Sequence, residues 1–282
     1  MSVRIITDTS SEYTPKEAKE LGITLIPMSL TYGEETLLDG EEIEKKEFYR
    51  RLLENKEIPV TSQPSPEQFL REFKKAKEAG DGVVAVLLSS SLSGTFQSAV
   101  LAKQLADYEE IYLVDSLNAT AAVKILTGTA WKLMKEGKTA AQIAEQLEEL
   151  KGRVQIYAVV DTLEYLYKGG RLSRAEAGLG TLANIKPLVQ ISREGKVEVF
   201  GKCIGRKRAC HQLVEKIKEE RMDPSYPVYL LYSANQENCE QFQKELLERT
   251  DWKQFEEMLE IGATIGTHIG GGAFGIAFVR EK

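Results

Sequence analysis

The sequence contains few of the residues from which metal centres and disulfide frameworks are built. It has three cysteines, Cys203, Cys210 and Cys239, without a CxxC pair, and only two histidines, His211 and His268, that could join them as ligands. Neither a structural zinc site nor a disulfide framework is therefore expected. Reduced thiols are typical of the cytoplasm, so we expect a cytoplasmic protein.

Long apolar runs and an excess of basic residues are also missing. No 18 apolar residues run together, and the first residues, MSVRIITDTS, lack a basic start followed by an apolar core. Neither a membrane span nor a secretion signal is expected, and a transient contact with a membrane surface is compatible with this. The 37 basic and 43 acidic residues give a formal net charge of −6. This balance argues against nucleic acid as a partner, because a DNA-binding regulator needs a basic face.

The 282 residues are enough for about two domains of about 150 residues each. Over residues 1–160, apolar segments alternate with helical ones, which predicts an α/β/α domain of the Rossmann-like kind around a parallel sheet. In this domain we expect a strand at 23–30, turns over 32–40 and a last strand at 154–160. Over residues 161–282 the hairpin signal Arg193-Glu194-Gly195 predicts an α+β domain with a mixed or antiparallel sheet.

Capping residues mark the starts of three helices. Thr14, Ser65 and Thr139 are each followed three residues later by a glutamate or glutamine, and proline follows the first two directly. A hydroxyl and a side-chain carbonyl at this spacing satisfy each other's backbone N–H groups. We therefore expect helices to begin at these positions.

The stretch 83–99, VVAVLLSSSLSGTFQSA, is a candidate anion site. An apolar strand ends in the serine-rich residues 89–93, and Gly94 leads into a helix that starts near Thr95. Hydroxyl donors, unpaired first-turn N–H groups and the positive end of the helix dipole all favour a bound anion. A serine-rich helix cap that holds no ligand would show the same pattern.

Polar residues also follow other predicted strands. Because ligands of open parallel sheets bind beyond the carboxyl ends of the strands, residues 7–8, 115–116 and 161–162 are candidates as well. The proline-rich residues 59–66 predict a stiff, extended approach that contains Thr61 and Ser62. A stiff segment can hold hydroxyls in place for a ligand, although a loop that only connects to the next helix would have the same sequence pattern.

The second half carries three further candidates. Residues 265–272, IGTHIGGG, predict a backbone-rich loop that brings N–H groups and His268 to an anion, unless the histidine is structural. Two glycines precede Arg171, whose guanidinium either binds a carboxylate or phosphate or bridges the two domains. Arg206 begins a basic cluster that is either a solvated helix face or a docking patch for an acidic partner.

Known catalytic and nucleotide motifs give little support for an enzyme. The glycines of 270–275 match G-x-G-x-x-G by count, but no helix follows them, and neither a Walker sequence nor G-x-S-x-G occurs. The alternative to a binding protein is a small-molecule phosphotransferase or hydrolase. It would use His268 as its base, next to the anion loop at residues 89–95.

Six segments of the chain form an ordered series. They are Thr7-Asp8-Thr9-Ser10, Thr61-Ser62-Gln63-Pro64-Ser65, Ser91-Leu92-Ser93-Gly94-Thr95, Val114-Asp115-Ser116, Lys168-Gly169-Gly170-Arg171 and Gly266-Thr267-His268. In order and spacing they resemble the signature series of the DegV family, the bacterial fatty-acid-binding proteins. The resemblance extends over about residues 3–279.

The resemblance implies a non-enzymatic protein of two domains that holds a long-chain fatty acid and needs no cofactor or metal. It implies that Arg171 lies near the head group and that a partner, a fatty acid kinase, phosphorylates the bound carboxylate to an acyl phosphate for phospholipid metabolism. Arg206 is then a candidate part of the kinase-docking surface. The carboxylate-binding residues implied are Thr61, Ser62, Ser93, Gly94, Thr95 and His268.

Two segments depart from the family pattern. Gly271 stands where the family usually has proline between two glycines, which would loosen the segment after His268. Residues 118–122 stand in place of the family's usual glycines and would alter the slot for the acyl tail.

Overall fold

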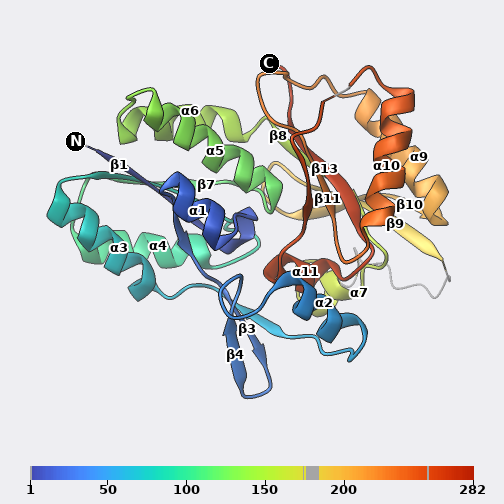
Figure 1. Ribbon diagram of the computed structural model, residues 1–282, viewed down its shortest axis with the longest axis horizontal. Coiled ribbons are helices and arrows are strands. Elements are labelled where there is room, and N and C mark those ends of the chain that lie inside the picture. The colour runs from blue at the N-terminus through green and yellow to red at the C-terminus, as the bar shows by residue number, and fades with distance from the viewer. Residues whose placement is uncertain (1, 174, 176–183, 253) are drawn as a thin grey trace.

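The described part of the chain forms three β-sheets, and helices cover the two larger ones (Figure 1). The computed structural model describes residues 2–173, 175, 184–252 and 254–282. The first sheet is parallel, in the order β2-β1-β6-β7. Its strands are β1 (Val3–Asp8), β2 (Thr24–Ile26), β6 (Gly82–Leu87) and β7 (Ile111–Asp115).

Strand β6 is buried along its whole length because helices pack on both faces of this sheet. Val83 and Ala85 point to one face, whereas Val84 and Val86 point to the other, as the two-residue repeat of a strand requires. The first face packs on α3 (Pro66–Ala79) and α4 (Thr95–Ala106). The second face packs on α1 (Pro15–Leu21), α5 (Ala121–Lys135) and α6 (Ala140–Lys151).

The predicted capping residues begin three of these helices. The hydroxyls of Thr14, Ser65 and Thr139 accept hydrogen bonds from the backbone of the third helical residue, and the side chain there bonds back. Helix α5 begins at Ala121, because Thr120 before it has a positive φ of 47°, outside the helical region.

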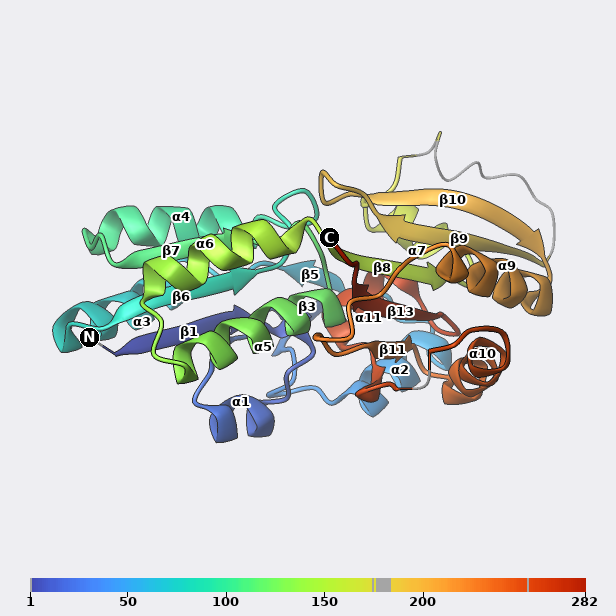
Figure 2. The ribbon, with the colours of Figure 1, turned by 90° about the horizontal axis from the view of Figure 1, so that it is seen from above.

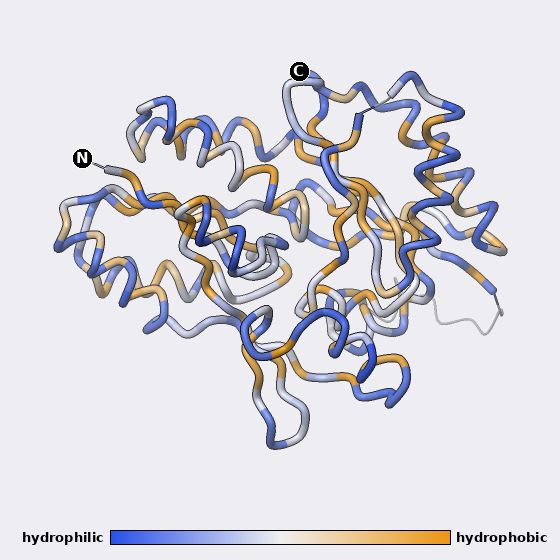
Figure 3. The backbone as a smooth tube through the Cα atoms, viewed as in Figure 1, coloured by the Kyte–Doolittle hydropathy of each residue, from blue (hydrophilic) through white to orange (hydrophobic). Residues whose placement is uncertain are grey.

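The second sheet has six strands in the order β10-β9-β8-β13-β11-β12 and is mixed. Helices α9 (Arg206–Lys218) and α10 (Gln236–Arg249) cover its outer face, and both are largely hydrophilic on the outside, whereas the strands are mostly apolar (Figure 3). The strands are β8 (Val154–Val159), β9 (Ile185–Ile191), β10 (Val197–Ile204), β11 (Tyr229–Tyr232), β12 (Glu257–Glu260) and β13 (Phe274–Val279).

Strand β8 corrects one expectation. The alternation of strands and helices predicted it as the last strand of the parallel sheet, but it pairs antiparallel with β9 and β13 of the second sheet. An apolar run looks the same in either sheet, so its periodicity could not assign it. The predicted fold class is nevertheless confirmed, and the domain limits at residues 160 and 161 stay a prediction.

A small third sheet corrects two more expectations. The single strand predicted at 23–30 is split, because β2 ends at Ile26 and β3 (Ser29–Tyr32) belongs to another sheet. The segment predicted as turns contains β4 (Glu35–Leu38), which pairs with β3. On the other side of β3 lies β5 (Val60–Ser62), where Thr61 stands opposite Leu30.

The segment predicted as a loop around His268 is a short helix, α11 (Ala263–Ile269). Gly266 inside this helix allows close packing against α2 (Lys45–Leu53). A Cβ at position 266 would lie only 2.6 Å from Phe48 Cε1, so a larger residue would push the two helices apart. Two more short helices are η1 (Thr9–Ser11) and α7 (Glu164–Lys168). Figure 2 shows the two larger sheets side by side, with α11 near their junction.

Candidate functional site

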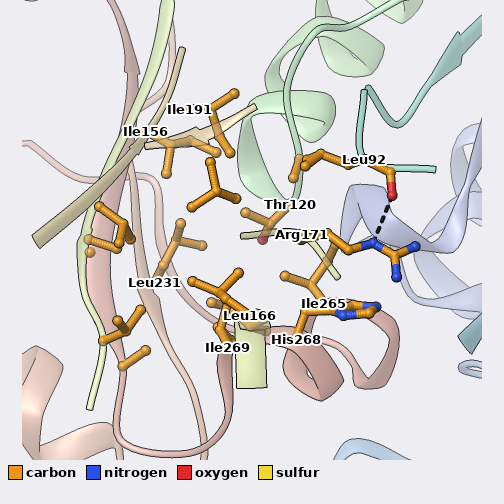
Figure 4. Close-up of a pocket in the computed structure, with 18 of the residues that line it drawn as sticks. Leu92, Thr120, Ile156, Leu166, Arg171, Ile191, Leu231, Ile265, His268 and Ile269 are labelled. Carbon is orange, nitrogen blue, oxygen red and sulfur yellow. Dashed lines mark hydrogen bonds between the residues drawn. The ribbon is translucent and has the colours of Figure 1, made fainter. Parts of the chain in front are cut away.

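A narrow cavity lies at the junction of the two larger sheets. Its walls come from the loops after β2, β6 and β7, from β5, from the inner face of the second sheet and from α11. Its volume is about 100 Å³. The side chains along most of its length are aliphatic, among them Leu88, Ile156, Leu166, Ile191, Leu231 and Ile265 (Figure 4).

The charged and titratable side chains of the cavity lie at one end. Figure 4 shows Arg171 and His268 close together there, whereas Ile156 and Ile191 lie at the opposite end. Thr61 reaches the same end from β5, with its Oγ1 2.9 Å from Nε2 of His268. The cavity therefore combines a long apolar slot with a compact polar end, which suits an amphipathic ligand.

His268 is neutral in this environment. Burial of the ring and the nearby Arg171 cation lower its pKa from 6.5 to about 4. Its buried Nδ1 has no hydrogen-bond partner among the described residues, and a Cβ on Gly169 would lie 2.0 Å from that atom. The glycine therefore makes the room that the imidazole occupies beside Thr61.

Arg171 brings a positive charge to the same end. Its Nε donates to the carbonyl of Leu92 at 2.9 Å, and Nη1 donates to the carbonyl of Gly169. No carboxylate pairs with it in the part of the chain that the structure describes. Burial lowers its pKa, yet a guanidinium stays charged at neutral pH, so this half-buried cation favours an anion in the cavity.

Ser93 joins the polar end from the loop before α4. Its Oγ lies 2.9 Å from Thr95 Oγ1 and accepts from the backbone N–H of Thr95 at 3.3 Å. Gly94 is the N-cap of α4, and within the described residues the first-turn N–H groups of Phe96 and Gln97 have no acceptor. The expected helix N-terminus with free donors is thus present beside the cavity.

Of the predicted carboxylate-binding residues, the structure brings only some to the cavity. Thr61, Ser93 and His268 line it, together with Arg171. Ser62, Gly94 and Thr95 are not among its lining residues. Ser62 is exposed because neighbouring residues of a strand point to opposite faces, and Thr95 is buried at the start of α4.

The carboxylates at the other strand ends bond within the protein. Asp8 is fully buried and accepts from the backbone N–H groups of Ser10 and Leu88. Asp115 accepts from two backbone N–H groups of neighbouring loops. Asp161 accepts from Arg206 and Lys186. None of the three lines the cavity, so these strand ends stabilise the loops around it.

Arg206 lies outside the cavity and is engaged by the protein. Its guanidinium donates to Asp161 at 2.9 Å and to Asn238 Oδ1 at 2.9 Å, and 39% of its side chain is exposed. Asn238 in turn donates to the carbonyl of Gly272, in the segment that follows α11. A role in docking stays a prediction.

The residues that line the apolar part of the cavity were not predicted from the sequence. An apolar slot and an apolar core have the same sequence pattern, so Ile156, Leu231 and their neighbours carry no separate signal. For α11 a signal existed: Ile265, His268 and Ile269 have the i, i+3, i+4 spacing of one helix face. Once the segment is taken as a helix, that spacing places all three on the cavity.

The described residues contain no group of three or more metal-ligating side chains, and none of their helices is long and apolar enough to cross a bilayer. A catalytic histidine is usually oriented by a third group at its other nitrogen, whereas Nδ1 of His268 has no partner in the described part of the chain.

Comparison with known proteins gives one family over the whole chain. A model of the DegV family, whose description is that of an uncharacterised protein family, matches residues 2–281. Protein DegV of Bacillus subtilis is 33% identical, over 99% of this chain and 99% of that protein. Its crystal structure, described as a fatty acid binding protein, superposes with a TM-score of 0.86 at 31% identity and covers 100% of both chains.

Two further solved structures are similar. A DegV family protein from Thermus thermophilus, described in terms of fatty acid binding, has a TM-score of 0.87 and 32% identity over 99% of this chain and 100% of that one. A stearic acid-binding protein from Eubacterium ventriosum has a TM-score of 0.84 and 25% identity over 99% of this chain and 98% of that one.

Proposed function

This chain belongs to the DegV family, and we propose that it binds a long-chain fatty acid in the cavity between its two larger sheets. One observation carries the proposal: a narrow aliphatic slot that ends at Thr61, Ser93, His268 and Arg171. A fatty acid has the same division into an apolar tail and one anionic head group. Its relatives of known structure are described as fatty acid binding proteins.

The head group is held by donors that remain after the protein's own bonds are made. The Thr61 hydroxyl, bonded to neutral His268, and the Ser93 hydroxyl both donate to the carboxylate, and Arg171 balances its charge. A carboxylate that meets hydroxyls and a half-buried guanidinium avoids the penalty of an unpaired buried charge.

The tail supplies most of the affinity. A 16-carbon tail is larger than the cavity of about 100 Å³, so the slot must widen to take the whole chain. About fourteen methylenes, at about 0.8 kcal/mol for each buried CH₂, then give on the order of 11 kcal/mol before the costs of ordering and widening. Each charged hydrogen bond at the head contributes about 1 to 3 kcal/mol. The slot therefore selects the acyl chain, and the polar end fixes which way round the ligand lies.

We further propose that the protein is a binding subunit, located in the cytoplasm, which presents the carboxylate to a fatty acid kinase for conversion to an acyl phosphate. The three cysteines are buried and free, which supports a reducing compartment. Arg206 supports a docking role, because its partner Asn238 bonds to Gly272 in the segment after α11. A contact at Arg206 is thus connected to the helix that carries His268.

Two experiments test these proposals. Native mass spectrometry of the purified protein should show a bound fatty acid, and protein that is ligand-free and ignores added palmitate and oleate contradicts the binding function. Incubation with ATP and palmitate should yield acyl phosphate only when a fatty acid kinase is added. Acyl phosphate made by this chain alone would favour the phosphotransferase alternative instead.

A further inference from the structure

Two carboxylates from distant parts of the chain cap the N-terminus of α11. Its N-cap residue is Gly262, which has no side chain. The N–H of Gly262 donates to Glu12 Oε2 at 2.7 Å, and the N–H of Thr264 donates to Asp39 Oδ2 at 3.1 Å. A Cβ at position 262 would lie 3.1 Å from Glu12 Oε2, so the carboxylates fill the place that a capping side chain normally takes.

Glu12 uses both carboxylate oxygens in this arrangement. Oε1 accepts from the hydroxyl of Thr120 at 2.9 Å, and Oε2 also accepts from Lys45 Nζ at 3.2 Å. Glu12 is 3% exposed, and both Glu12 and Thr120 have positive φ, 64° and 47°. Two strained residues joined by one hydrogen bond persist only where the surroundings hold them, and such strain is concentrated at functional sites.

The opposite end of α11 carries His268. The helix has only seven residues, roughly 10 Å at 1.5 Å per residue, so its anchored first turn fixes where its last turn lies. The side of α11 away from the cavity rests on α2, where Gly266 lies against Phe48. The packing of α11 on α2 at Gly266 is apolar, whereas the cap at its first turn holds the helix through charged carboxylates.

Resting on the proposed function, we propose that Glu12 and Asp39 are positioning residues: by capping α11 they hold His268 at hydrogen-bonding distance from Thr61, ready for a carboxylate. Neither Glu12 nor Asp39 lines the cavity, but Thr264 of α11, which donates to Asp39, and Thr120, which donates to Glu12, both do. Both carboxylates therefore act on the ligand through their bonding partners, above all through the start of α11. Because coupling between sites is reciprocal, a bound fatty acid must also tighten the capping bonds.

Near-isosteric variants separate this role from general stability. In Glu12→Gln the negative charge that faces Gly262 N–H and Lys45 Nζ is lost, and the new NH₂ group must turn to the Thr120 hydroxyl, which then accepts. In Asp39→Asn an oxygen can still face Thr264, and only the charge is lost. The readout is the ratio of the Kd for hexadecanol to the Kd for palmitate, because the two probes share a tail and differ in head group.

We expect Glu12→Gln to lower this ratio about tenfold, within the usual range for coupled sites, and Asp39→Asn to lower it less. Hexadecanol affinity should change little in both. The matched control is Glu220→Gln: this carboxylate side chain is 9% exposed, accepts from Tyr157 Oη at 2.6 Å, and touches neither α11 nor the cavity. Its ratio should equal that of the wild type.

The inference is overturned if both variants fold and keep the wild-type ratio, or if they weaken both probes equally. A wild type that does not prefer palmitate to hexadecanol would instead refute the proposed function. If the variants do not fold, hydrogen exchange of the wild-type protein still tests the coupling. Palmitate should slow amide hydrogen exchange at Gly262 several-fold and leave Glu17, in the cap of α1, unchanged. Unchanged exchange at Gly262 contradicts the coupling.

Discussion

Substitution Gly169→Ala tests whether the place of the imidazole matters for binding. The φ of Gly169 is −77°, so alanine suits the backbone, but its Cβ would lie 2.0 Å from Nδ1 of His268. The ring must move, which breaks its 2.9 Å contact with Thr61. Loss of one buried hydrogen bond at a charged ligand is worth about 1 to 3 kcal/mol, or roughly 5- to 150-fold in Kd.

The assay is titration of palmitate against each purified variant by calorimetry. Gly152→Ala is the matched control, because Gly152 also ends a helix, has a φ of −68°, and has nothing within 4 Å of the added Cβ. We expect wild-type affinity for the control and weaker binding for Gly169→Ala. If both variants bind palmitate like the wild type, the imidazole does not help to hold the head group.

Four further predictions concern the same cavity. Thr61→Ala and Ser93→Ala should each weaken palmitate binding about tenfold, because each removes a hydroxyl donor from the head group, and titration of palmitate checks this. The pKa of His268 is about 4 in the unliganded protein and should rise when a carboxylate binds beside it, as NMR titration of the imidazole can show. The unfolded chain protonates this imidazole near pH 6.5, whereas the folded protein does so only near pH 4. The stability contributed by neutral His268 is therefore complete above pH 6.5 and is lost as the pH falls towards 4. In His268→Gln the free energy of unfolding in urea should depend less on pH over this window than in the wild type. Ile156→Trp should fill the slot opposite the head group and shift the acyl preference of the wild type towards shorter acids in a competition assay.

Three of these have a control or a contradicting result of their own. Ser62→Ala, on the exposed face of β5, should bind like the wild type. Ile204→Trp adds the same bulk at a residue that is 69% exposed and should leave the acyl preference unchanged. An imidazole pKa that stays near 4 in the palmitate complex would place the carboxylate away from His268.

Local signals in the sequence predicted the elements that depend on local chemistry. The caps at Thr14, Ser65 and Thr139 begin helices where their hydroxyl and amide spacing predicted them. The hairpin signal at 193–195 joins β9 and β10, which pair antiparallel. These features are decided within four or five residues, so sequence alone contains the information.

Features that depend on distant partners were missed. Strand β8 joins the second sheet because β13, more than 100 residues later, pairs with it. Helix α11 forms where glycines indicated a loop, because its N-terminal donors are satisfied by Glu12 and Asp39 from the first 40 residues. The sequence placed Thr61, Ser93 and His268 near one ligand only through the family resemblance, since no local pattern joins β5 to α11.

The walls of the cavity come from both large sheets, so a ligand bound there would contact both halves of the protein and help to hold them together. An acyl chain there would take the place of interior side chains that neither half supplies, and it would favour the folded over the unfolded protein by mass action. The melting temperature would then rise with ligand concentration, so it would report whether the protein holds a ligand. Empty molecules would be the first to unfold and to meet proteases, which would leave the loaded form to accumulate.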